Sequence, residues 1–382
     1  MAKLGEVCLI NPKSCTLRDD TEVSFIPMTK VGEHGEFDAS EIKNYSEVKK
    51  GFTNFQNGDI LFAKITPCME NGKGAIAHNM KNGIGFGSTE FHVLRPDTDK
   101  ITSEWLYYLT TWKTFRKEAE RNMTGSAGQK RVPKTFLENY VVNLPDIDTQ
   151  KSENKILRKV DDLIFLRKQQ LAKLEELVKA RFVEMFGDPV VNSKRWPVET
   201  IENHIDLLTG FPFDSSGYVS KGVNICGGLI IMPQKIDWSA CKHWPQITGY
   251  EDYILRPNDI VIALDRPWIS NGFKIAMVDR EHLPALLIQR TARIRAVDIN
   301  QHYLMQSLLL GRFDKHCNIT GSLVPHISPK DIKSYSVMIP PIELQNQFAT
   351  FEERVDQQKQ TVQQSLEKLE LMKKALMQEY FG

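Results

Sequence analysis

Two long stretches of the chain carry an apolar residue at every seventh position and contain neither glycine nor proline. The first lies between Asp146 and Gly187, and the second between Pro341 and Gly382. Seven residues make close to two helical turns, so each pattern predicts one long amphipathic helix. The residues of the two apolar stripes are Ile164, Leu171, Leu174 and Val178 in the first stretch, and Val355, Val362, Leu366, Leu369, Met372 and Leu376 in the second.

The predicted helices are long for a globular protein. A helix of about 36 residues extends about 54 Å at 1.5 Å per residue, which is more than the single domain before it can cover. We therefore expect the two helices to pair with each other as a coiled coil through their apolar stripes. The alternative is that each helix packs only on its own globular domain.

The remainder of the chain is also repeated. The matching pairs are Gly58–Ala63 with Asn258–Ala263, Leu144-Pro145 with Ile339-Pro340, and Glu184–Gly187 with Glu379–Gly382. The offset falls from 200 to 195 along the chain, as insertions into the loops of a duplicated domain would cause. The sequence therefore predicts two units, residues 1–187 and 188–382.

Within each unit, the part before the long helix has the pattern of a mixed α/β (α+β) domain. Short apolar runs bounded by turn residues predict strands. A helical spacing of apolar residues follows them at 103–120 and again at 300–316. The predicted strands are 59–64, 72–77 and 91–94 in the first unit, and 259–264, 272–278 and 292–297 in the second. The expected domains are 1–145 and 188–340, with helical segments at 146–187 and 341–382.

Composition narrows the class of protein. Of the 382 residues, 41% are apolar and 25% charged, as in a folded soluble protein, and no run approaches the length that spans a membrane. We find no secretory signal, and the six cysteines form no CxxC pair, so we expect a cytoplasmic protein with reduced thiols and no metal site. With a net charge of +1, a DNA-binding chain must either gather its positive charge on one face or rely on a partner for much of the phosphate contact.

Motifs of common catalytic sites are missing from the sequence. It contains no GxxxxGK[ST], GxSxG, HExxH or GxGxxG segment. The only Pro-Pro pair, Pro340-Pro341, follows an isoleucine, unlike the Asn/Asp-Pro-Pro-aromatic motif of amino-methyltransferases. We therefore expect a non-catalytic chain that binds no cofactor of its own.

Polar, cationic and aromatic residues gather in loops at matching places in the two units. They are the residue types that contact base edges and phosphates in DNA, and Lys130 and Arg131 are expected to contact phosphates. Arg116 and Lys117 belong to the same group of cationic residues. The alternative for each residue is an ordinary solvated loop, or for Arg290 an ion pair inside its domain. The candidate DNA-binding residues are Lys64, Thr66, Asn71, Lys73, Ser88, Thr89, Lys130, Arg131, Arg266, Trp268, Asn271, Lys274, Gln289, Arg290 and Arg293.

The combined arrangement resembles the specificity (S) subunits of type I restriction-modification systems. The segments that carry the resemblance cover most of the chain, although 146–150 departs from the family's usual helix entrance. They are Asn57–Pro67, Glu70–Lys73, Gly87–Phe91, Val132-Pro133, Leu144-Pro145, Arg181–Pro189 and Ile339–Gln345.

The resemblance implies two target-recognition domains, each reading one half of a split, asymmetric double-stranded DNA target, and two long helices that pair in antiparallel fashion. It also implies that two DNA methyltransferase (modification) subunits dock on the helices, alongside restriction (endonuclease/translocase) subunits. S-adenosylmethionine and ATP would then be bound by those partners. The loops 64–73 and 266–274 differ in sequence, so the two half-sites are expected to differ.

Two other functions remain open at this point. One is a coiled-coil scaffold that binds no DNA, which sequence-specific duplex binding by the assembled complex would exclude. The other is a methyltransferase or nuclease that acts on DNA directly, which activity of the purified chain alone would establish.

Overall fold

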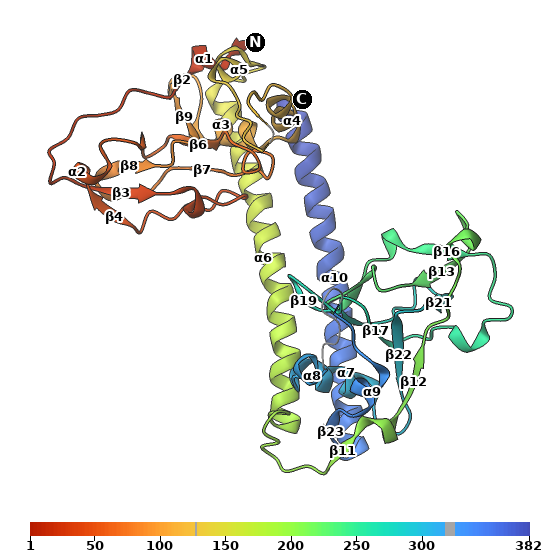
Figure 1. Cartoon of the computed structure of the whole chain (residues 1–382). Coiled ribbons are helices and arrows are strands. Elements are labelled where there is room, and N and C mark those ends of the chain that lie inside the picture. Colours follow the sequence, from red (N-terminus) through yellow and green to blue (C-terminus); the bar gives the residue numbers. More distant parts are fainter. Residues whose placement is uncertain (127, 318–324) are drawn as a thin grey trace. The chain divides into compact units, whose positions relative to one another are not determined.

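The computed structural model describes residues 1–126, 128–317 and 325–382 (Figure 1). They separate into two compact units, one formed by 1–167 with 365–382 and the other by 168–364. Both unit boundaries lie inside the two long helices, α6 (Ile147–Phe186) and α10 (Ile342–Phe381), so each unit contains part of each helix. The prediction of two long helices is confirmed. No helix among the described residues is long and apolar enough to cross a membrane.

The first unit contains two four-stranded sheets. One is antiparallel throughout, and the other contains one parallel pair, β3 with β8. The antiparallel sheet has the order β2 (Cys8–Ile10), β9 (Phe91–Pro96), β6 (Ile60–Ala63) and β7 (Gly74–Ile76). The second sheet has the order β4 (Ile42–Asn44), β3 (Glu22–Ile26), β8 (Ile84–Gly87) and β5 (Thr53–Gln56).

Helices of the first unit pack the antiparallel sheet against the long helices. The segment predicted as one helix at 103–120 is broken at Trp112, whose backbone is extended (φ −60°, ψ 131°). Trp105 is fully buried, donates to Glu153 at 2.7 Å and contacts the ring of Phe381 at 4.8 Å. The shorter elements are α1 (Leu4–Val7), α2 (Tyr45–Val48), α3 (Ser103–Thr111), α4 (Lys113–Arg121), α5 (Lys134–Asn139), β1 (Ala2–Lys3) and β10 (Val141–Val142).

The second unit repeats the strand order of the first. Its antiparallel sheet is ordered β12 (Ile205–Thr209), β22 (Thr291–Ala296), β17 (Ile260–Ala263) and β20 (Ile275–Met277). Its second sheet has the order β16 (Lys242–Trp244), β13 (Val223–Cys226) and β21 (Ala285–Leu287), with β13 and β21 parallel. The register also repeats, because Ile60 pairs with Leu94 and Ile260 with Ile294.

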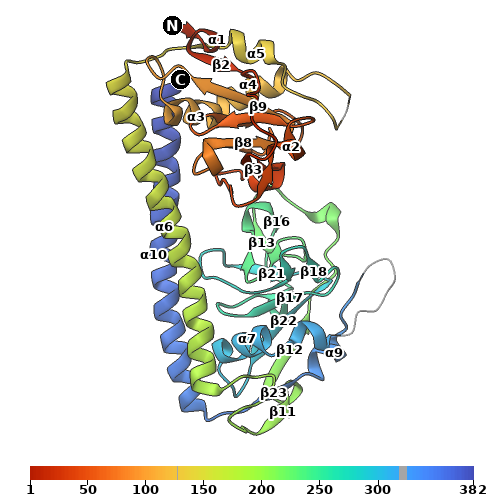
Figure 2. The same cartoon turned by 90° about the vertical axis from the view of Figure 1, so that its left-hand side faces the viewer.

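The remaining elements of the second unit are short, apart from α7 (Gln301–Leu310), which lies beside α10 in both views (Figure 2). The segment predicted as a helix at 300–316 is divided at Gly311 and Arg312, and Arg312 has φ 60°. The others are α8 (Phe313–His316), α9 (Pro329–Lys333), β11 (Val198–Thr200), β14 (Ile231–Met232), β15 (Lys235–Ile236), β18 (Trp268–Ile269), β19 (Gly272–Phe273) and β23 (Ser336–Met338).

Parts of α6 and α10 contact each other within each unit. In the first, Asp161 and Lys373 form an ion pair at 2.6 Å, and Arg167 Nε lies 3.3 Å from Ser365 Oγ. In the second, the Phe182 and Phe348 rings are 5.4 Å apart. Within the first unit the residue numbers of the two helices change in opposite directions, so the helix segments there are antiparallel.

The predicted apolar stripes are buried or half-buried, with one correction. Val178, Val355, Val362 and Leu366 are buried, and Ile164, Leu171, Leu174, Leu369 and Leu376 are half-buried. Met372, however, is 51% exposed, and Met377 is buried instead. Successive helical residues are rotated by about 100°, and Lys373, which faces Asp161, therefore leaves its neighbour Met372 on the outer side.

A buried ion pair joins α7 to α10 in the second unit. His302 Nδ1 lies 2.8 Å from Glu352 Oε2, and Gln306 Nε2 donates to Glu352 Oε1 at 2.6 Å. Burial works to lower the pKa of His302, but Glu352 and the nearby carboxylates Glu353 and Asp356 raise it by more, so the pKa lies above 6.5. The folded state therefore favours the protonated imidazole.

We expect this pair to make the stability of the second unit depend on pH. A raised folded-state pKa contributes stability that is fully present below the unfolded pKa and is lost as the pH rises through the folded pKa. The free energy of unfolding should thus fall as the pH rises above about 6.5, the ordinary pKa of histidine. His302→Gln should flatten this dependence in urea unfolding, and the exposed control His316→Gln should retain it. Equal slopes for His302→Gln and the unmodified chain would contradict the assignment.

Candidate nucleic-acid interface

Three loops of the first unit meet beside the antiparallel sheet. They are 64–73 between β6 and β7, 88–90 between β8 and β9, and 128–132 before α5. Backbone hydrogen bonds join them: Lys64 N donates to Glu90 O at 2.9 Å, Thr66 N to Lys130 O at 3.0 Å, and Val132 N to Lys64 O at 2.9 Å. The loops are therefore held together by the main chain, whatever side chains they carry.

The second unit has the same three connections at matching positions. Leu264 N donates to Arg290 O at 2.9 Å, Arg266 N to Pro325 O at 2.8 Å, and Ile327 N to Leu264 O at 2.9 Å. The predicted match of Gly125-Ser126 with Gly321-Ser322 lies outside the described residues. The sequence repeat therefore corresponds to one loop cluster in each unit, and we call these the first and second loop clusters.

The longest loop differs between the two clusters. In the second unit it forms a hairpin of its own, because β18 pairs with β19 and the rings of Trp268 and Phe273 lie 5.1 Å apart. In the first unit the loop turns back on itself through Asn71 N to Pro67 O at 3.0 Å and Lys73 N to Cys68 O at 3.0 Å. The two clusters thus present side chains on different backbones.

Most of the predicted DNA-contacting residues reach the surface of these clusters. The exposed ones are Asn71, Thr89 and Lys130 in the first cluster, and Arg266, Asn271, Gln289 and Arg290 in the second. The half-buried ones are Lys64, Thr66, Ser88 and Trp268. The structure therefore brings together residues that lie up to 66 positions apart in the sequence, from Lys64 to Lys130.

Two predicted residues are buried, and we remove them from the DNA-facing set. Arg293 is 4% exposed and pairs with Asp206 on the neighbouring strand β12. Lys274 is 6% exposed, its ammonium donates to the carbonyl of Gly228, and burial lowers its pKa. A charged group held in this way cannot reach a ligand without breaking its own bond, at a cost in free energy.

Lys73 and Arg131 also have partners inside the protein. Lys73 Nζ donates to Met28 O at 3.1 Å, which is the counterpart of the Lys274 bond in the second unit. Arg131 forms two 2.9 Å bonds with Glu90, and this pairing lowers the pKa of the Glu90 carboxyl. Both cations fasten one loop to another, so they shape the cluster instead of standing free for a phosphate.

Arg290 retains the properties of a base-reading side chain. Its side chain is 74% exposed, and within the described part of the chain it forms an ion pair with Asp265, at 3.3 Å. Asp265 is shared with His326 at 2.7 Å. The alternative of an internal ion pair is thus partly realised, but an exposed pair of this kind is weak and can be exchanged for a ligand.

Sequence analysis missed one feature that repeats in both units, at the end of the antiparallel sheet opposite the loop cluster. Asp59 and Arg95 form two 2.8 Å bonds in the first unit, and Asp259 and Arg295 form two 2.7 Å bonds in the second. Both aspartates are almost fully buried. The equal 200-position spacing of Asp59 with Asp259 and of Arg95 with Arg295 was a signal that could have identified these pairs.

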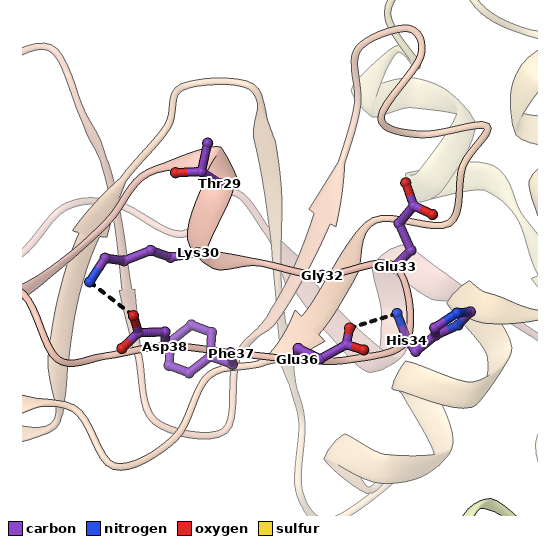
Figure 3. Close-up of a pocket in the computed structure, with 8 residues that line it drawn as sticks. All are labelled: Thr29, Lys30, Gly32, Glu33, His34, Glu36, Phe37 and Asp38. Atoms are coloured by element: carbon purple, nitrogen blue, oxygen red, sulfur yellow. Dashed lines mark hydrogen bonds and ion pairs between the residues drawn. The ribbon is translucent and has the colours of Figure 1, made fainter. Parts of the chain in front are cut away.

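A cavity next to loop 64–73 is unsuited to DNA. It has a volume of about 510 Å³ and is lined by eight residues between positions 29 and 38, including Glu33, Glu36 and Asp38 (Figure 3). Gly74 N, just after the loop, donates to Gly32 O of this lining at 3.2 Å. Hydrogen bonds from Ser40, followed by Lys30, lower the pKa of Asp38 to about 2, so this carboxylate stays ionised and repels phosphate. Among the described residues no group of histidine, cysteine and acidic side chains could hold a metal ion.

The sequence of this chain is similar to those of specificity subunits of type I restriction enzymes. Residues 1–176 match the family described as type I restriction modification DNA specificity domain. The chain is 31% identical over 439 residues to the type I restriction enzyme EcoAI specificity subunit of Escherichia coli, covering 86% of this chain and 72% of that one. It is also 44% identical over 145 residues to the EcoEI specificity subunit of Escherichia coli, covering 37% of this chain and 24% of that one.

Two solved structures share the fold. A chain from a study of complex assembly and conformational transition in the type I R-M system aligns with a TM-score of 0.57 and 17% identity, covering 99% of this chain and 96% of that one. The type I restriction-modification S subunit from M. genitalium aligns with a TM-score of 0.57 and 13% identity, covering 100% of this chain and 95% of that one.

Proposed function

The chain belongs to the specificity subunits of type I restriction-modification systems, and on that basis we propose that its two loop clusters read the two halves of a split, asymmetric DNA target. The observation that carries this proposal is the repeated set of three backbone bonds, which gathers base-reading side chains at the same place in both units. Because the longest loops differ in sequence and backbone, the two half-sites are expected to differ.

The same proposal gives the rest of the chain its role. The recognition domains are 1–145 and 188–340, and the helical segments 146–187 and 341–382 pair as an antiparallel coiled coil. Two DNA methyltransferase subunits dock on these helices, restriction subunits join them, and the assembly acts in the cytoplasm. Methyl transfer with S-adenosylmethionine and ATP-driven cleavage then belong to the partner chains, and this chain is non-catalytic.

Replacing residues 188–340 with the same domain of another specificity subunit tests this proposal. The chimera, assembled with modification subunits, should methylate adenines in a target with one half changed and the other half and the spacing retained. Sequencing that maps methylated adenines in a host genome measures this outcome. A change in both halves, or methyl transfer by the chain alone, would contradict the proposal.

Arg290→Ala tests the second cluster at one residue. If Arg290 contacts a guanine through two bonds, its loss should weaken binding by about 1–3 kcal/mol and relax one base of one half-site. The exposed Arg280 serves as the control, and Arg280→Ala should leave the methylated sequence unchanged. An unchanged target together with lower protein stability would show instead that Arg290 acts only through its pair with Asp265.

A further inference from the structure

Arg116 is a buried arginine with an unusual set of partners. It projects from α4 and is 7% exposed, and within the described part of the chain no carboxylate forms an ion pair with it. Its donors go to main-chain carbonyls: Nε to Thr110 O at 2.6 Å, Nη1 to Met69 O at 2.8 Å, and Nη2 to Gly72 O at 3.0 Å. Both terminal nitrogens also lie 3.4 Å from Lys73 O.

These contacts satisfy a charge that burial makes costly. Burial lowers the pKa of Arg116 to about 10, which still leaves the guanidinium protonated at neutral pH. Thr110 O lies at the C-terminal end of α3, where the helix dipole is negative. The guanidinium also lies 4.7 Å from the centre of the fully buried Phe62 ring, a cation–π contact. Three carbonyls of one loop thus converge on one planar group that presents several donors.

The surrounding residues make room for this group. A Cβ at Gly74 would lie 3.3 Å from Arg116 Nη2 and 2.8 Å from Leu61 O. A side chain there would therefore press on the guanidinium and the carbonyls around it, which we call the arginine cradle. In the second unit the matching position is Ile275, and the position that follows Phe313 is Asp314, not arginine. The second loop cluster therefore lacks this cradle, and its hairpin of β18 and β19 gives the loop its shape instead.

The carbonyls that bind Arg116 turn the main chain inward, while Glu70 and Asn71 of the same loop are exposed. We propose that Arg116 is a specificity-determining positioning residue: it holds loop 64–73 in the conformation that presents Glu70 and Asn71 to the first half-site. This inference rests on the proposed function, since it assumes that the loop faces DNA. The sequence had placed Arg116 among the residues expected to contact DNA. The structure instead gives it the role of shaping a loop that does so.

Two measurements on the chain assembled with modification subunits test the inference. In the complex that carries the native chain and no DNA, the amides of Asn71, Gly72 and Lys73 should already be protected from hydrogen exchange. Arg116→Lys keeps the charge but loses the planar set of donors, and it should lower this protection about tenfold. Methylation should then become about tenfold less selective at one or more bases of the first half-site, with the second half unchanged.

Arg116→Met provides the stronger change, and Lys113→Met is its matched control, because Lys113 is an exposed cation on the same helix that was not among the candidate DNA contacts. The control should retain both halves of the target and the loop protection. The inference is overturned if the amides of 71–73 exchange freely in the complex with the native chain. It is equally overturned if both Arg116 variants keep the target unchanged. It is also overturned if both variants expose the amides of β6 and β9, since Arg116 would then act in folding. A complex with no bipartite target at all would instead refute the proposed function.

Discussion

Phe182→Ala is expected to lower the free energy of unfolding of the second unit by about 3–5 kcal/mol, the usual range for removing a fully buried aromatic ring. Phe182 lies in α6 and stacks on Tyr303 of α7 at 5.5 Å. It also contacts Phe348 of α10 at 5.4 Å and Phe186 at 4.9 Å. One ring therefore joins three helices, and its removal leaves a cavity that the neighbouring rings cannot readily fill.

Urea unfolding followed by circular dichroism measures this effect. Val183 is the adjacent residue on α6 and is 44% exposed, so Val183→Ala is the matched control. We expect the control to change stability by no more than about 0.5 kcal/mol. If Phe182→Ala cost as little as the control, the three helices would not depend on this ring cluster.

Asp59→Ala should destabilise the first unit by about 3 kcal/mol, because breaking a buried pair leaves its partner without a counter-charge. Asp59 is 1% exposed, accepts both bonds of Arg95 and also accepts from Gln56 N at 2.8 Å. The hydrogen bond with Asp59 raises the pKa of Arg95. Without it the guanidinium still remains charged, because the ordinary pKa of arginine is far above neutral pH. Asp259→Ala should act equally on the second unit, where Arg295 and Arg256 N are the partners.

Thermal unfolding of each variant, with methylation mapped in the assembled complex, checks this expectation. Glu22→Gln is the control, because it removes an exposed ion pair with Lys81 and should have little effect. Each aspartate lies at the end of its sheet opposite the loop cluster, so we expect each change to act through the stability of its unit and to leave the methylated sequence unchanged. Equal stability of Asp59→Ala and Glu22→Gln would contradict the assigned role of the buried pair.

The sequence alone was sufficient for the features that depend on spacing. The seven-residue recurrence predicted α6 and α10, because helix geometry places such residues on one face. The repeat predicted that β6 and β17 occupy matching places, and it located the loops beside them. Both signals lie in the order of residue types along the chain, so no knowledge of tertiary packing is needed to read them.

Tertiary structure decided which polar side chains remain available. Arg293, Lys274 and Arg116 are cationic like the exposed Arg290, and their sequence neighbours give no sign of their burial. What separates them is the position of carbonyls and carboxylates from distant segments, such as Asp206 for Arg293 and Gly228 for Lys274. The break at Trp112 likewise depends on packing. A side chain's partners are set by the folded chain, and a sequence pattern records only the side chain's type.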